Sequence, residues 1–261
     1  MSQKAYYFYP DDQVKILLHT ALLYQIEKCN FEKVSDIDYL AQFSRFENSD
    51  LDAITGVFNN IIYYHLQYTN KEVFCDSLYQ RLISSITDEK TIEEISFTYN
   101  MLMSYHYINS DKVEKYVTKA LEIKGNYADA KFIMDNYLFR KLNNSSNSLA
   151  FLDTINKIEL KYNIETINLL IKDYKLIAYL KIAEEYFDQQ KISEGDKYLE
   201  EFESNCTLPI DNQRLSLIIE STYRTAAVYY YYEGNKTEAK SYVDRGLKYV
   251  PNSKFLESVL N

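Results

Sequence analysis

The chain has 261 residues, and its 29 Lys and Arg against 38 Asp and Glu give a net charge of −9. It contains only 5 Gly and 3 Pro, whereas β-sandwiches and barrels need many tight turns built from these residues. The composition therefore excludes an all-β fold and a Gly-rich phosphate loop. The acidic total argues against nucleic acid as a partner of this chain alone. The 27 Tyr and 13 Phe argue against disorder, so an all-α fold is predicted.

Apolar residues recur mostly at intervals of three and four, which is the period of an α-helix. Clusters of Asn, Ser, Asp and Thr rather than Gly separate these stretches, and Asp50, Asp88 and Asp211 are expected to cap helix starts. About thirteen helices are predicted in chain order, over 11–29, 35–47, 50–68, 71–86, 88–107, 110–124, 126–142, 147–162, 164–190, 192–204, 210–234, 236–249 and 252–260.

The polar, low-complexity stretch from Asn143 to Ser148 is predicted to be a loop. A domain boundary is one interpretation, but helices of the same style continue after it, which favours one continuous array. The sequence has no run of 18 apolar residues and no apolar signal segment near its start, so we expect no membrane span and a cytoplasmic location. The cysteines Cys29, Cys75 and Cys206 are far apart, which favours reduced thiols.

A repeat is clearest near the C-terminus, where Glu220–Ser253 contains ESTYRTAAVYYYYEGNKTEAKSYVDRGLKYVPNS. This segment resembles the tetratricopeptide repeat, a helix–turn–helix unit of 34 residues. Small residues let two antiparallel helices approach closely, an aromatic fills the wedge where they splay, and proline stops the second helix. The residues that carry the resemblance are Tyr223, Ala226, Ala227, Tyr230, Gly234, Asn235, Ala239, Gly246 and Pro251.

Weaker units of the same kind start near residues 55, 94 and 176, so their spacing is irregular. In the unit from 176, for example, Tyr179, Ala183 and Tyr186 fall in the first helix and Gly195 in the second. The resemblance is clear over 94–124 and 176–253. The whole of 1–261 is therefore interpreted as one domain, with degenerate helices in 1–54, repeats in 55–124, degenerate linker helices in 125–175, and clear repeats with a capping helix in 176–261.

The resemblance implies that the units stack into an α-solenoid, a right-handed superhelix whose concave groove is lined by the first helices. It also implies which positions face that groove. A Tyr offers a large rigid area with one polar group, and Arg224 near Tyr231 would suit a carboxylate or a backbone carbonyl. The alternative is that these tyrosines pack between helices. The implied groove residues are Thr98, Leu102, Tyr105, His106, Leu180, Glu184, Phe187, Asp188, Arg224, Val228, Tyr231 and Tyr232.

Motifs for catalysis or metal binding are not found in the sequence. None of His19, His65 and His106 has a metal-binding partner at i+3 or i+4. We therefore expect no enzyme activity, no cofactor and no metal. His106 is a possible ligand-binding group, whereas His19 and His65 are interpreted as surface or core residues.

The expected function is that of an adaptor or scaffold, in which the groove binds a protein or a short peptide. The alternative is the peptide-signal sensor domain of a bacterial regulator of the Rap and PlcR type, although 1–54 shows no helix-turn-helix motif. Asn amides can bond a peptide backbone, and candidates are Asn59, Asn60, Asn100 and Asn136. The terminal segment with Phe255, Leu256, Val259 and Leu260 is expected to cap the array or to form a homodimer contact.

Overall fold

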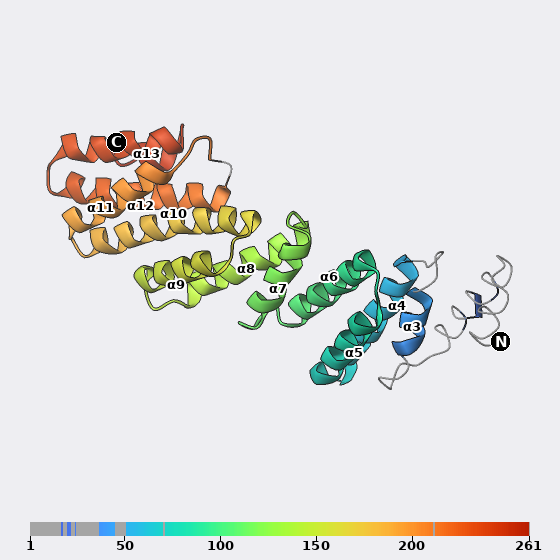
Figure 1. Ribbon diagram of the computed structural model, residues 1–261. Helices are drawn as coiled ribbons and strands as arrows, with labels where there is room; N and C mark the ends of the chain where they lie inside the picture. The colour runs from blue at the N-terminus through green and yellow to red at the C-terminus, as the bar shows by residue number, and fades with distance from the viewer. Residues whose placement is uncertain are drawn as a thin grey trace. The chain divides into compact units, whose positions relative to one another are not determined.

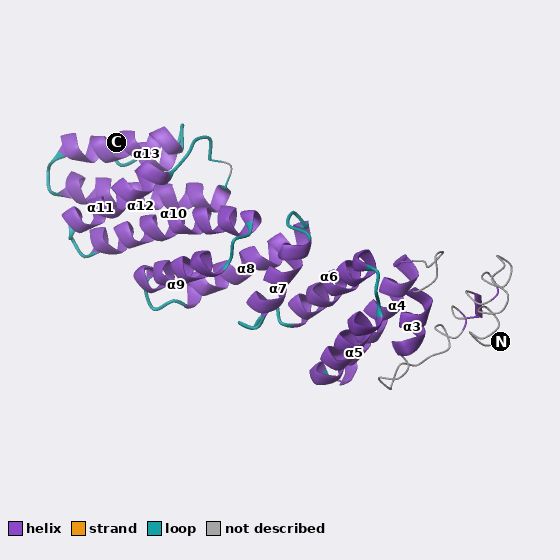
Figure 2. Cartoon of the chain, viewed as in Figure 1, coloured by secondary structure: helices purple, strands orange, loops and turns teal. Residues whose placement is uncertain are grey.

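The computed structural model describes residues 37–44, 51–69, 71–210 and 212–260, with the single positions 17, 20, 21 and 24. Within these ranges the protein is all-helical and contains no β-strand (Figures 1 and 2). The elements are α3 (Asp38–Ser44), α4 (Leu51–Tyr64), the π-helix η2 (His65–Thr69), α5 (Glu72–Ser85), α6 (Glu89–His106), α7 (Val113–Ile123), α8 (Ala128–Asn144), α9 (Ser148–Lys161), α10 (Glu165–Asp188), α11 (Ile192–Asn205), α12 (Gln213–Tyr232), α13 (Lys236–Tyr249) and α14 (Lys254–Glu257).

The predicted spans agree with these helices to within a few residues, apart from 11–29, which lies mostly outside the described residues. Side-chain caps explain several starts. Asp88 accepts a hydrogen bond from the Thr91 N–H at α6, as expected. At α12 the cap is Asn212, and the predicted Asp211 is not described. Gly234 adopts a positive φ of 77°, which supplies the turn between α12 and α13.

The chain divides into two compact units, Met1–Tyr137 and Leu138–Asn261. The boundary falls inside α8, shortly before the predicted loop at 143–148. In the first unit α6 packs against α4 and α7. In the second unit α10 packs against α9, α11 and α12, and α12 packs against α13. The helices of three expected pairs, α6 with α7, α10 with α11 and α12 with α13, therefore pack as neighbours. Their assignment to repeats and their arrangement as a superhelix stay predictions.

Close approach of helices in the second unit depends on two glycines. The ring of the buried Phe187 on α10 covers Gly195 on α11, where a Cβ would lie 2.6 Å from the ring Cδ1. A Cβ at Gly246 would lie 2.8 Å from Leu256 and 3.0 Å from Tyr223. Because Leu256 belongs to α14 and is fully buried, this glycine allows the terminal helix to seat on the α12–α13 pair.

Aromatic and charged side chains also join α11, α12 and α13. The Tyr223 hydroxyl donates to Glu203 at 2.7 Å, and Arg245 Nε donates to the same carboxylate at 2.9 Å. The Tyr242 hydroxyl donates to Asp196 at 2.6 Å. Burial, followed by these carboxylate acceptors, raises the pKa of both phenols. These bonds satisfy polar groups that would otherwise be costly to bury.

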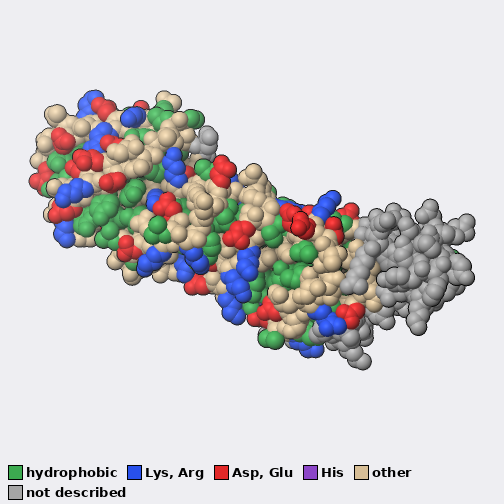
Figure 3. All heavy atoms as spheres, viewed as in Figure 1, with side chains coloured by type: hydrophobic (Ala, Val, Ile, Leu, Met, Phe, Trp, Pro, Cys, Tyr) green, Lys and Arg blue, Asp and Glu red, His purple; other side chains and the backbone are tan. Residues whose placement is uncertain are grey.

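On the face shown in Figure 3, basic and acidic side chains intermingle over the described residues. None of the described helices combines the length and the apolar character needed to cross a membrane.

Candidate functional site

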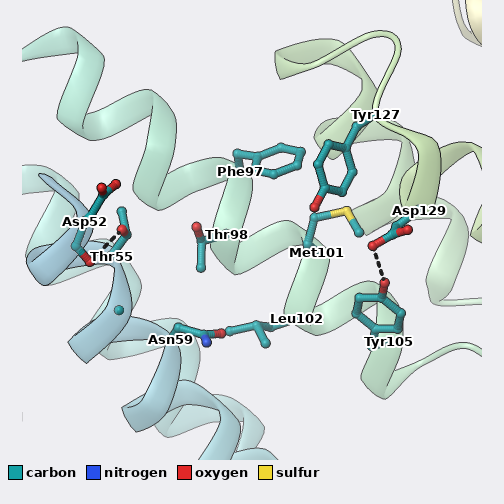
Figure 4. A pocket seen from close by; sticks show the side chains of 11 residues that line it. Asp52, Thr55, Asn59, Phe97, Thr98, Met101, Leu102, Tyr105, Tyr127 and Asp129 are labelled. Carbon is teal, nitrogen blue, oxygen red and sulfur yellow. Dashed lines mark hydrogen bonds between the residues drawn. The ribbon is translucent and has the colours of Figure 1, made fainter.

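An open pocket of about 370 Å³ lies in the first unit, between α4, α6 and the start of α8 (Figure 4). Five of its lining residues are exposed at the surface, so the pocket is a trough rather than an enclosed cavity. Its lining residues are Asp52, Thr55, Gly56, Asn59, Phe97, Thr98, Met101, Leu102, Tyr105, Tyr127 and Asp129.

Helical periodicity explains how two walls of this pocket form. The lining residues of α4 stand at i, i+3, i+4 and i+7 from Asp52, and four of the five on α6 follow the same pattern from Thr98. Each set therefore occupies one helix face. Other positions of these helices, such as Phe58 on α4 and Met103 on α6, are fully buried in the core. The third wall comes from Tyr127 and Asp129, at the start of α8.

Aromatic rings gather at the α8 end of the pocket. Phe97 and Tyr127 meet edge to face with their centroids 4.8 Å apart, and Figure 4 shows Tyr105 directed toward Asp129. The Tyr105 hydroxyl donates to Asp129 Oδ2 at 3.0 Å. Burial, followed by this carboxylate acceptor, raises the pKa of Tyr105 to about 12. The phenol therefore stays protonated at neutral pH and serves as a hydrogen-bond donor.

Several polar side chains of the pocket have no hydrogen-bond partner among the described residues. These are the Asn59 amide, the Thr98 hydroxyl and the Asp52 carboxylate. The Thr55 hydroxyl instead bonds back to the α4 backbone, at 2.9 Å from the Leu51 oxygen. A Cβ at Gly56 would meet nothing within 4 Å, which shows how much space adjoins this wall. The pocket thus offers donors and acceptors beside an apolar floor.

Three of the groove residues predicted in the first unit line this pocket, namely Thr98, Leu102 and Tyr105. The fourth, His106, lies outside the lining and interacts with α5, where its Nε2 is 3.3 Å from Glu72 Oε1. The prediction that His106 faces a ligand groove therefore finds no support in this pocket and stays a prediction. A hydrogen bond from the Tyr107 hydroxyl is the main reason why the pKa of Glu72 is lowered, with smaller contributions from His106 and Lys112.

The groove positions predicted in α10 are mostly engaged within the second unit. Leu180 and Phe187 are buried in the core, so the expectation that they face a groove is wrong. Phe187 turns inward because Gly195 has no Cβ to exclude its ring. Glu184 accepts a hydrogen bond from the Ser221 hydroxyl of α12, and Asp188 alone in this set is exposed.

In α12, Arg224 was predicted to lie near Tyr231. The Arg224 guanidinium instead lies over the Phe255 ring of α14, 4.5 Å from the ring centroid. The ammonium of Lys236 lies 5.7 Å from the centroid of Tyr231. Val228 is half-buried, and Tyr232 is 83% exposed. Contact between Arg224 and the terminal helix was not anticipated.

Other chemistry-bearing groups are placed as follows. Cys75 is buried, and burial raises the pKa of its thiol to about 12; Cys206 is half-buried. His65 is buried beside Phe74, with ring centroids 4.6 Å apart, whereas His19 and Cys29 lie outside the described residues. Within the described ranges, no three His, Cys, Asp or Glu side chains are grouped to hold a metal ion.

The contributions of α4 and α8 to the pocket, including Asp52, Tyr127 and Asp129, are not predicted by the sequence patterns. Asn59 was predicted only as one of four Asn residues that could bond a peptide backbone. Of these four, Asn100 and Asn136 donate to the backbones of their own helices. A scan against protein-family models and searches of curated proteins and of solved structures found no match to this chain.

Proposed function

We propose that this protein is a non-enzymatic binding module that takes an extended protein segment or a short peptide into the pocket between α4 and α6. The observation that carries this proposal is the open trough of about 370 Å³, in which polar groups without internal partners stand beside an apolar floor. An extended chain presents alternating backbone polar groups and side chains, and it needs both kinds of surface.

The individual groups suit such a ligand. The Asn59 amide can donate to a backbone carbonyl and accept from a backbone N–H, and the Thr98 hydroxyl can do the same from the facing helix. Met101 and Leu102 supply an apolar surface for side chains. Asp52 and Asp129 stand at opposite ends of the pocket in Figure 4, so they do not form the converging pair that acid–base chemistry requires.

The test is selection of peptides from a random display library on the full-length protein, followed by binding measurements on variants. Gly56→Phe should block the trough from a position where a Cβ has free space. Gly56→Ala is the matched control, because it adds one methyl group and leaves the trough open. We expect the selected peptides to lose at least about tenfold in affinity for Gly56→Phe and to bind Gly56→Ala nearly as well as the wild type.

Equal binding to Gly56→Phe would refute the proposed site, since the peptides would then bind elsewhere. Failure to select any peptide would refute binding of short segments by this pocket. Circular dichroism of both variants shows whether the helices remain intact.

A further inference from the structure

The α8 end of the pocket has a composition that selects among possible ligands. We define the aromatic–carboxylate corner as Phe97, Tyr105, Tyr127 and Asp129. We infer that this corner receives a Lys or Arg side chain from the bound protein segment. The inference rests on the proposed function, because it names the chemistry of the segment that the pocket would bind.

Charge is the first argument. The described lining contains two carboxylates, Asp52 and Asp129, and no Lys, Arg or His. The partner of Asp129 in the corner is the neutral Tyr105 phenol at 3.0 Å, which leaves the negative charge of the carboxylate uncompensated. No described Lys or Arg lies within ion-pair distance of either Asp. A cationic group would complete this site, whereas an anionic group would be repelled.

The aromatic rings are the second argument. Tyr105 is 47% exposed and Tyr127 is 40% exposed, so both rings offer surface to a ligand. Phe97 already holds an ammonium from this chain, since Lys124 Nζ lies 4.3 Å from its ring centroid. The charge of Lys124 is balanced by Glu94 at 2.8 Å. Faces of aromatic rings attract such cations.

The shape of the pocket favours a protein segment over a free amine. The corner occupies one end of a trough that continues past Thr98 and Asn59 toward Asp52 (Figure 4). The apolar stem of a Lys or Arg would lie along Met101 while its charged end reaches Asp129. The remaining trough would then hold the backbone of the same segment.

The Asp129 carboxylate could also serve to stabilise the start of α8, and the test has to distinguish this structural role from ligand binding. Asp129 lies in the first turn of α8, where a carboxylate is favoured by the helix dipole. Glu89 occupies the first turn of α6, is exposed and does not line the pocket. The variants Asp129→Asn and Glu89→Gln therefore remove the same charge from equivalent helix positions, and only one of them alters the corner.

The experiment uses five pools of nine-residue peptides with random positions around a fixed central residue, which is Arg, Lys, citrulline, norleucine or Glu. Their retention is measured on the immobilised full-length protein. We expect the Arg and Lys pools to be retained about tenfold more than the other three. This excess should fall to near unity on Asp129→Asn and on Tyr127→Leu, and it should persist on Glu89→Gln.

Loss of the excess on Glu89→Gln as well would overturn the inference, because the net charge of −9 would then explain the attraction. An unchanged excess on Asp129→Asn would also overturn it. If pocket-dependent retention is strongest for the norleucine or Glu pool, the inference fails while the proposed function stands. If no pool shows retention that depends on Gly56→Phe, both fail.

Discussion

Replacing Gly195 by alanine should destabilise the second unit, although the same change in a helix normally stabilises a protein. The new Cβ would lie 2.6 Å from Cδ1 and 2.9 Å from Cζ of Phe187, and closer still to Cε1. Carbon atoms in ordinary contact are about 3.5 to 4.0 Å apart, so the ring would have to retreat by about 1 Å. Phe187 is only 2% exposed and meets Tyr242 edge to face, which leaves it little room.

Two opposing effects set the magnitude. Alanine in place of glycine in a helix gains up to about 1 kcal/mol. Overpacking a core costs about 1 to 3 kcal/mol, and contacts this short place Gly195→Ala near the upper end. The net destabilisation should therefore be about 2 kcal/mol. Gly56→Ala on α4 is the matched control, because its Cβ meets nothing within 4 Å and it should stabilise by up to about 1 kcal/mol.

The assay is urea unfolding followed by circular dichroism, together with hydrogen exchange of peptides from α10 and α11, since the two compact units can unfold separately. The double variant Gly195→Ala with Phe187→Leu should recover part of the loss, because leucine lacks the ring atoms that clash. If Gly195→Ala raises the free energy of unfolding as Gly56→Ala does, the proposed close packing of Phe187 on Gly195 is refuted.

Three further predictions concern hydrogen bonds, thiols and pH. Glu203→Ala should lower the free energy of unfolding by about 1 to 3 kcal/mol, because Tyr223 and Arg245 lose a shared acceptor. The control Asp244→Ala breaks only the exposed pair with Lys240 and should lower it by less than about 0.5 kcal/mol in the same urea titration. Alkylation of the native protein, followed by mass spectrometry, should modify Cys206 well before the buried Cys75, and equal rates would contradict the packing around Cys75. Because the pKa of Tyr105 is raised from 10.0 to about 12, its contribution to stability is complete below pH 10 and is lost as pH rises from 10 toward 12. Unfolding measured across this range should show a shallower decline for Tyr105→Phe than for the wild type, and parallel curves would refute the assignment.

Local patterns account for the success in predicting the helices. The apolar period of three and four residues places α5 to α13 within a few residues of their predicted spans. The cap at Asp88 and the turn at Gly234 depend on adjacent residues, so the sequence alone reveals them. Whether the helix pairs continue into one superhelix depends on packing between distant residues, which such patterns do not specify.

The candidate site was predicted only in part for the same reason. Thr98, Leu102 and Tyr105 share one face of α6, and helical spacing is enough to group them. Asp52 and Asp129 come from helices far apart in the chain, and no period links them to α6. Phe187 was predicted to face the groove because the repeat pattern assigns its position to that helix face. The structure instead buries its ring, because Gly195 has no Cβ and leaves space for the ring.

The half-exposed Tyr127 has a practical consequence, because the chain contains no tryptophan. A Tyr127→Trp variant would carry its sole indole at the mouth of the trough, against the edge of Phe97. Excitation beyond the tyrosine band would then report from this position alone, although many of the chain's 27 tyrosines remain elsewhere. Occupancy of the trough would become visible as a change in emission wavelength or in quenching by iodide, without a label attached to the ligand.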